Sequence, residues 1–179
     1  MNSIEIMADI TDALAAIDAS RVAFKNFQPG VDPYSEPQLL KHIAQPLNNL
    51  PKYKGRVTTR RTADLLIPQE WGIELKIVQP FGDNGNQAEN WSVNLLQPYS
   101  GNTSTIGDCL KFVQLRYSKR LAMVVIGYEH PPSKIDLSSL IKTFEVITDQ
   151  VANITLFKRT EIHRENLVHP VHQSVRLFA

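Results

Sequence analysis

The chain has 179 residues, of which 42% are hydrophobic and 21% charged, a composition typical of a globular protein with one core. Its 19 lysine and arginine residues nearly balance 18 aspartate and glutamate residues, and the net charge of +1 excludes a protein that binds nucleic acid through bulk positive charge. The single cysteine, Cys109, excludes an internal disulfide and a cysteine-based zinc cluster.

These bounds lead us to expect a soluble, cytoplasmic protein with a single domain. The longest uninterrupted apolar run, residues 121–126, is too short to cross a bilayer. Residues 1–20 carry four acidic and no basic side chains, unlike a signal or transit peptide. Within the domain we expect an N-terminal helix and loop at residues 1–33, a core at 34–160 and a C-terminal tail at 161–179.

Hydrophobic spacing predicts two helices in the N-terminal part of the chain. An apolar i, i+4, i+7 stripe that begins at Ile10 predicts a short acidic helix. Ser35 and Gln38 have the spacing of a capping box, which predicts the start of a second helix. Pro46 is expected to kink or end this helix, because proline has no amide hydrogen to donate.

The middle of the chain is rich in β-branched residues and predicts strands. Residues 56–59, 63–67 and 73–78 are the three candidates, and the polar turn at 68–72 predicts a hairpin between the last two. The nearly continuous apolar run at 121–128 is typical of a strand that is buried on both faces.

Three further helices complete the predicted order. A short helix is expected at 91–96, a second begins at a cap formed by Thr103 or Ser104, and a long amphipathic helix follows Ser133. Residues 154–157 are a further strand candidate. This order predicts an α/β or α+β protein, with a three-layer α/β/α sandwich around a mixed sheet.

The most informative feature is Asp64, followed ten positions later by Glu74-Leu75-Lys76. If the two strands of the hairpin are antiparallel, Asp64 lies opposite Lys76 or Val78, with Glu74 and Lys76 on one face and Leu75 in the core. Two carboxylates so close together repel each other unless a hard cation such as Mg²⁺ binds them. Such a cation polarises a phosphoryl oxygen and activates a water, and an ammonium group offsets developing charge. The arrangement therefore predicts phosphodiester hydrolysis.

These residues resemble the PD-(D/E)xK nuclease superfamily, which includes many restriction endonucleases and nucleases of DNA repair and phage defence. The resemblance covers residues 34–128, and the following helix and strand also fit the αβββαβ restriction-endonuclease-like core that it implies. In this resemblance Asp64 and Glu74 bind Mg²⁺, for which Mn²⁺ can substitute. The main-chain carbonyl of Leu75 is a further metal ligand, and Lys76 assists the nucleophile.

Two positions extend or depart from the pattern. Ala63 stands where the family often has proline. Some members also carry a glutamate on the first core helix, and Glu36 is the candidate here, although an acid in a first turn also compensates the helix dipole. An ordinary Glu-Lys pair on a sheet face is the alternative explanation of the triplet, and its apolar neighbours favour a functional role.

A run of positive charge precedes the predicted site, and it suits contacts with phosphates beside a cut strand. The five candidates for nucleic-acid binding are Lys52, Lys54, Arg56, Arg60 and Arg61. Lys111 belongs to a second basic group, which either contacts phosphates or stabilises the end of a helix.

Our first hypothesis is a Mg²⁺-dependent endonuclease of the restriction, defence or repair type. Its expected partner is double-stranded DNA, and a homodimer or partner subunit would allow both strands to be cut. The alternative is a non-catalytic nucleic-acid-binding or assembly module on the same fold. A third hypothesis is a small-molecule protein in which residues 52–61 hold an anionic ligand. No motif of a serine hydrolase, a P-loop NTPase or a dinucleotide-binding protein is present.

Overall fold

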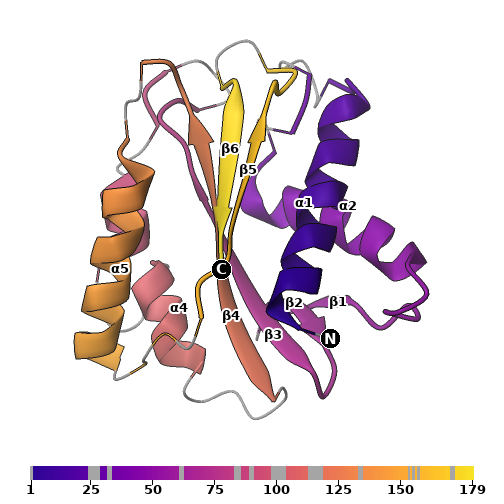
Figure 1. The fold of residues 1–179 in the computed structure, drawn as a ribbon, viewed down its shortest axis with the longest axis horizontal. Helices are drawn as coiled ribbons and strands as arrows, with labels where there is room; N and C mark the ends of the chain where they lie inside the picture. Colours follow the sequence, from indigo (N-terminus) through magenta and orange to yellow (C-terminus); the bar gives the residue numbers. More distant parts are fainter. Residues whose placement is uncertain are drawn as a thin grey trace.

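A six-stranded sheet organises the described part of the chain, in the order β1-β2-β3-β4-β6-β5 (Figure 1). The computed structural model describes residues 2–23, 29–31, 34–60, 63–82, 86–88, 91–97, 104–112, 119–132, 135–152, 154, 156, 158–169 and 172–179. The strands are β1 (Thr58–Arg60), β2 (Ala63–Ile67), β3 (Trp71–Val78), β4 (Arg120–Glu129), β5 (Glu161–Glu165) and β6 (Ser174–Phe178). The helices are α1 (Ser3–Ala19), α2 (Glu36–Asn49), α3 (Trp91–Leu96), α4 (Thr105–Phe112) and α5 (Leu137–Ala152).

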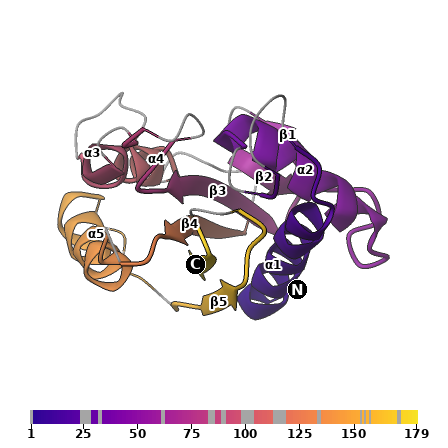
Figure 2. The same cartoon turned by 90° about the horizontal axis from the view of Figure 1, so that it is seen from above.

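The sheet is mixed, and helices cover both of its faces. β3 pairs with β4 in parallel, whereas the other neighbouring strands are antiparallel. Figure 2 shows α1 and α2 together on one side of the sheet and α3, α4 and α5 together on the other. The chain is therefore an α/β protein with a mixed sheet, as the sequence predicts. None of the described helices is both long and apolar enough to span a membrane.

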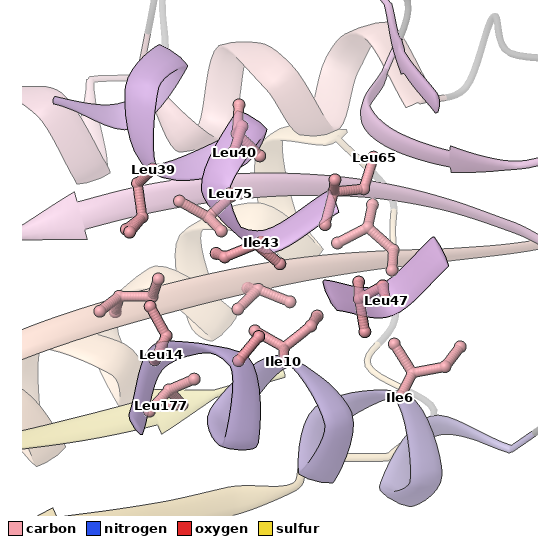
Figure 3. Packing of buried hydrophobic residues seen from close by; sticks show 14 of the residues in the cluster. Ile6, Ile10, Leu14, Leu39, Leu40, Ile43, Leu47, Leu65, Leu75 and Leu177 are labelled. Atoms are coloured by element: carbon pink, nitrogen blue, oxygen red, sulfur yellow. The ribbon is translucent and has the colours of Figure 1, made fainter. Parts of the chain in front are cut away.

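Apolar side chains fill the space on both faces of the sheet. Ile10 and Leu14 of α1 and Ile43 of α2 meet Leu75 and Leu177 of the sheet in one cluster (Figure 3). A second cluster joins α3, α4 and α5 to the opposite face. Because both faces are covered, the central strand β4 needs apolar residues at nearly every position, which explains its nearly continuous apolar sequence.

The start of α2 is confirmed, and of the two effects expected of Pro46, a kink or an end, the end does not occur. Ser35 and Gln38 form the expected capping box. The helix then continues past Pro46 to Asn49, because Leu47 lies beyond the proline and is buried in the core. Tertiary packing of this last turn compensates for the hydrogen bond that Pro46 cannot make. Helix α1 has 17 residues and is thus longer than the short helix expected.

The structure identifies the residues that cap α4 and α5. The Ser104 hydroxyl accepts a main-chain N–H of the first turn of α4, whereas Thr103 lies outside the described residues. At the start of α5, the Asp136 carboxylate accepts the main-chain N–H of Ser139 at 3.1 Å. Asp136 therefore caps this helix, and Ser133, the predicted cap, lies outside the described residues.

The C-terminal part of the chain differs from the expected tail, because it supplies two strands of the main sheet. β6 lies between β4 and β5 and pairs antiparallel with both. Val175 and Leu177 alternate with polar residues and are buried in the core, which is the strand signal that the prediction missed. Of the strand candidate at 154–157, the described residues Ile154 and Leu156 are not in a strand.

Replacing Ile43 with alanine tests the packing of α2. Ile43 is completely buried, so Ile43→Ala removes apolar contacts and leaves a cavity that costs about 2–5 kcal/mol of unfolding free energy. The matched control is Ile4→Ala, because Ile4 is 49% exposed and its loss changes stability by about 0.5 kcal/mol or less. Chemical denaturation of both variants measures the difference, and equal effects would contradict this packing.

Candidate active site

Asp64 and Glu74 face each other on the antiparallel strands β2 and β3. The register pairs Leu65 with Ile73, which makes Asp64 and Glu74 the next opposed pair along the hairpin. Side chains at such positions start about 5 Å apart, and the two carboxyl groups are hydrogen-bonded to each other. The expectation that Asp64 lies opposite Lys76 or Val78 is wrong. β3 begins two residues earlier than predicted, so the turn is shorter and the register moves by the same amount.

The carboxylates of Asp64 and Glu36 bind main-chain groups along the same edge of β3. Among the described residues, the pairing of β2 with β3 stops at Leu65 and Ile73. Beyond that point the Leu75 N–H donates to Asp64 Oδ2 at 2.8 Å, and the Ile77 N–H donates to Glu36 Oε1 at 2.9 Å. The two carboxylates thus occupy places that carbonyl groups of a neighbouring strand would otherwise take.

Lys76 lies two residues after Glu74, and its ammonium group is held by acidic side chains from two helices. Its Nζ atom is 3.3 Å from Glu36 Oε2 and 3.6 Å from Asp108 Oδ2. The side chain of Lys76 is only 11% exposed, so these partners are needed to offset its loss of hydration. The structure therefore brings together all four predicted catalytic side chains, those of Asp64, Glu74, Lys76 and Glu36.

Asp108, on α4, is the member of this cluster that sequence reasoning missed. Besides Lys76 it contacts Lys111, one turn further along the helix, in a close salt bridge. A hydrogen bond to Asp108 raises the pKa of Lys111. An aspartate in a first turn usually only compensates the helix dipole, so its type and spacing carry no specific signal. The informative hint is its place between the apolar positions Ile106 and Cys109, on the helix face that turns toward the sheet.

Burial of Glu74 dominates the electrostatics of the site. Burial raises the pKa of Glu74 to about 9, and the charge of Asp64, the hydrogen bond with it and the charge of Asp108 act in the same direction. The positive charge of Lys111 opposes them. Without a cation, Glu74 therefore keeps its proton at neutral pH, and its O–H group donates a hydrogen bond to Asp64.

The pKa of Glu36 is also raised, but less than that of Glu74. Burial raises its pKa, while the charge of Lys76 and the hydrogen bond from the Ile77 N–H act in the opposite direction. The cluster as a whole contains four carboxyl groups and two ammonium groups, which leaves two negative charges when every group is ionised. Such an excess attracts a cation.

The donor set of the site suits magnesium. In the described part of the chain, no group of three or more His, Cys, Asp or Glu side chains is placed to hold a metal ion. Mg²⁺, however, is commonly bound by one or two carboxylates, with water and substrate phosphate as its other ligands. Asp64 and Glu74 fit this coordination, and Leu75 lies beside them with its side chain in the core, as expected. A zinc site built only from protein ligands does not fit.

Most of the predicted basic segment lies away from this cluster. Three of its residues, Lys52, Lys54 and Arg56, lie between α2 and β1. Glu36 is at the start of α2 and these three residues follow its end, and a helix of 14 residues is about 21 Å long. Two of them are paired with acids, since Lys52 Nζ is 2.6 Å from Asp9 Oδ2 and Arg56 Nη2 is 2.8 Å from Glu70 Oε1. They are therefore poorly placed to contact a phosphate at the site.

Arg60 is the member of the basic segment that lies close to the site. It is exposed on β1, and its register partner on β2 is Ala63, the residue before Asp64. Arg61 lies outside the described residues. Of the predicted nucleic-acid contacts, Arg60 thus keeps the best support from position.

Comparisons with models of protein families, with curated proteins and with solved structures found no match for the chain. The resemblance to PD-(D/E)xK nucleases accordingly rests on four residues, Asp64, Glu74, Leu75 and Lys76, and on the order of the elements around them. The geometry and chemistry of the cluster carry the functional argument.

The raised pKa of Glu74 predicts a specific dependence of stability on pH. Because the folded protein holds this proton more tightly than the unfolded chain, the contribution of Glu74 to stability is complete below about pH 4.5 and is lost as the pH rises toward 9. Glu74→Gln removes this loss and keeps a hydrogen-bond donor for Asp64. We expect this variant, without divalent cations, to melt about 2–6 °C above the wild type at about pH 8, with a smaller difference at about pH 5.

The control for this measurement is Glu165→Gln, which removes an exposed glutamate on β5. Thermal melts of the three proteins across this pH range, in the presence of a chelator, provide the comparison. A melting-temperature difference between Glu74→Gln and the wild type that stays constant with pH would mean that Glu74 does not titrate in this way.

Proposed function

We propose that this protein is a Mg²⁺-dependent nuclease that hydrolyses phosphodiester bonds. One observation carries the proposal: two hydrogen-bonded carboxyl groups lie on neighbouring strands, with a buried ammonium group two residues along the same strand. The Leu75 N–H accounts for a carboxylate at Asp64, but not for a second buried carboxyl group beside it, because Glu74 must stay protonated there at neutral pH. Binding of a divalent cation between Asp64 and Glu74 would remove this cost.

Each residue of the cluster has a role in the proposed reaction. Mg²⁺ held by Asp64 and Glu74, with the carbonyl of Leu75, would polarise a phosphoryl oxygen and lower the pKa of a bound water. Lys76 donates hydrogen bonds to the attacking water or to the phosphate, and its charge offsets the negative charge that develops there. Glu36 holds Lys76 in position, because its two carboxylate oxygens bind the ammonium group and the edge of β3.

DNA is the proposed substrate, because the resembled family mostly cuts DNA in restriction, defence or repair. The favourable position of Arg60 supports contacts with the phosphate backbone next to the site. Since one such site cuts one strand at a time, a homodimer or a partner subunit would be needed for coordinated cleavage of double-stranded DNA.

A cleavage assay tests this function directly. Plasmid, linear duplex and single-stranded substrates are incubated with Mg²⁺, Mn²⁺ or EDTA, and the wild type is compared with Glu74→Ala and Lys76→Ala. We expect cleavage that requires the metal and falls by at least about 100-fold in both variants, because each removes a group that acts in the transition state. Circular dichroism shows whether the variants remain folded.

Lys142→Ala is the matched control, because Lys142 is an exposed lysine on α5 and its loss leaves the cluster intact. Cleavage by all variants at the wild-type rate would contradict the proposed site. If the wild type binds nucleic acid but does not cut it, and binding is indifferent to Mg²⁺ and to Lys76→Ala, the chain is a non-catalytic binding or assembly module instead.

Cation binding has a readout that does not depend on activity. At pH above neutrality, saturating Mg²⁺ should raise the melting temperature of the wild type by several degrees, because an ion that binds only the folded state stabilises it by about 3 kcal/mol at 100 times its dissociation constant. Asp64→Asn and Glu74→Gln should abolish the shift. An equal shift in all three proteins, measured by differential scanning fluorimetry, would place any bound ion elsewhere.

A further inference from the structure

Lys111, near the end of α4, is an exposed cation attached to the candidate active site. Its ammonium group forms a close salt bridge with one carboxylate oxygen of Asp108, and the other oxygen is 3.6 Å from Lys76 Nζ. The side chain of Lys111 is 55% exposed, whereas those of Lys76 and Asp108 are only 11% and 8% exposed. The cluster thus has one ammonium group inside it and a second one on its solvent side.

Compensation of the helix dipole does not explain this position of Lys111. A lysine in the last turn of a helix has that effect when its charge lies near the final carbonyl groups. Lys111 instead turns back by one turn to contact Asp108. The hydrogen bond to Asp108 raises the pKa of Lys111, and the charges of Glu74 and Asp64 add to this effect. Lys111 therefore lies within electrostatic reach of both proposed metal ligands.

The charge of Lys111 determines whether the site, once it holds a metal ion, attracts an anion. With every group ionised, the four carboxyl and two ammonium groups of the cluster leave two negative charges, which one Mg²⁺ neutralises. Without Lys111 the same site would keep a negative charge and would repel a phosphodiester.

The carboxylate of Asp108 separates the two ammonium groups and so determines which phosphate each can bind. A phosphate placed between Lys76 and Lys111 would also meet Asp108, whose negative charge repels it. Lys76 is buried and two residues from Glu74, so it suits the phosphate that is cut. Lys111 lies on the solvent side of Asp108 and suits a second phosphate.

We propose that Lys111 binds a phosphate next to the one that is cut, so that the substrate is a polynucleotide strand and not a small phosphodiester with a single phosphate. The inference rests on the proposed function, because it places the cut phosphate at the metal ion held by Asp64 and Glu74. Every linkage of a strand carries a negative charge, so one strand can occupy the metal ion and Lys111 together. Asp108 is a positioning residue here, since its buried carboxylate holds the long side chain of Lys111 in place.

Binding of two single-stranded thymidine oligomers of equal length tests the proposal. One has natural phosphodiester linkages, and in the other every linkage except the central one is an uncharged methylphosphonate. Both are titrated against the full chain at several salt concentrations, with Ca²⁺ in place of Mg²⁺. For the natural oligomer, Lys111→Met should weaken binding by about three- to fivefold at low salt and make the plot of log K against log salt concentration less steep by about 0.7, because one ion pair with a phosphate is lost.

The oligomer with a single phosphate gives the comparison that decides the proposal. Its one phosphate occupies the metal ion and leaves none for Lys111, so Lys111→Met should weaken its binding by less than about twofold. This retained binding also shows that the variant is folded. An equal loss with both oligomers would overturn the proposal, and so would an unchanged affinity for the natural oligomer.

Two further variants show whether the effect belongs to the charge at this position. Lys111→Arg keeps the charge and should keep the salt dependence of the wild type. Lys142→Met removes the charge of an exposed lysine on α5 and should keep it too. A salt dependence as shallow as that of Lys111→Met in either variant would overturn the proposal.

The same measurements separate this inference from the proposed function. Mg²⁺-dependent cleavage, together with an equal effect of Lys111→Met on both oligomers, overturns the role of Lys111 and leaves the nuclease standing. A loss confined to the natural oligomer, in a protein that cuts no substrate, supports the role of Lys111 and overturns the nuclease. Absence of binding of the natural oligomer to the wild type overturns both.

Discussion

The early end of the β2–β3 pairing is the constraint on which the candidate site depends. β3 continues beyond its last partner on β2, and its exposed N–H groups would be costly to leave unpaired at a partly buried edge. Asp64 and Glu36 bind them with carboxylate oxygens at 2.8 and 2.9 Å. An acidic side chain from a strand and another from a helix are thereby fixed at the same place, next to Glu74 and Lys76.

This arrangement concentrates negative charge where the protein can least hydrate it. Glu74 keeps a proton and so carries no charge that Asp64 could repel. Lys76 and Lys111 neutralise part of the negative charge of the other carboxylates. In the folded chain alone, the carboxyl groups of the cluster thus lie close together at a cost in stability, which a bound divalent cation would reduce. The arrangement that the proposed activity requires therefore lowers the stability of the fold, as is common where like charges are brought together for catalysis.

The sequence predicts most of the elements because their signals are local. β2 and α3 have the expected bounds, and the capping box at Ser35 and the buried strand β4 are confirmed. The candidate site residues were found because their types and spacing resemble a family pattern. The register of Asp64 could not be predicted reliably, since two residues at the start of β3 decide it.

Other features depend on contacts between distant parts of the chain. Asp108 joins the site only because α4 packs against the face of the sheet that carries Lys76, and no local pattern shows this. The basic segment is continuous in sequence, but helix α2 separates most of it from the site. The course of α2 past Pro46 depends on the burial of Leu47, which outweighs the local preference of proline.

The position of β6 between β4 and β5 has a consequence for how the protein becomes folded. β4 lies at residues 120–129, yet its partner on one side comes only from residues 174–178. During synthesis on the ribosome, β4 is therefore made before β6, and one edge of β4 stays unpaired until β6 has been made. Open apolar edges are sites of association between chains, so any fragment that ends before β6 would aggregate even though it holds every residue of the candidate site.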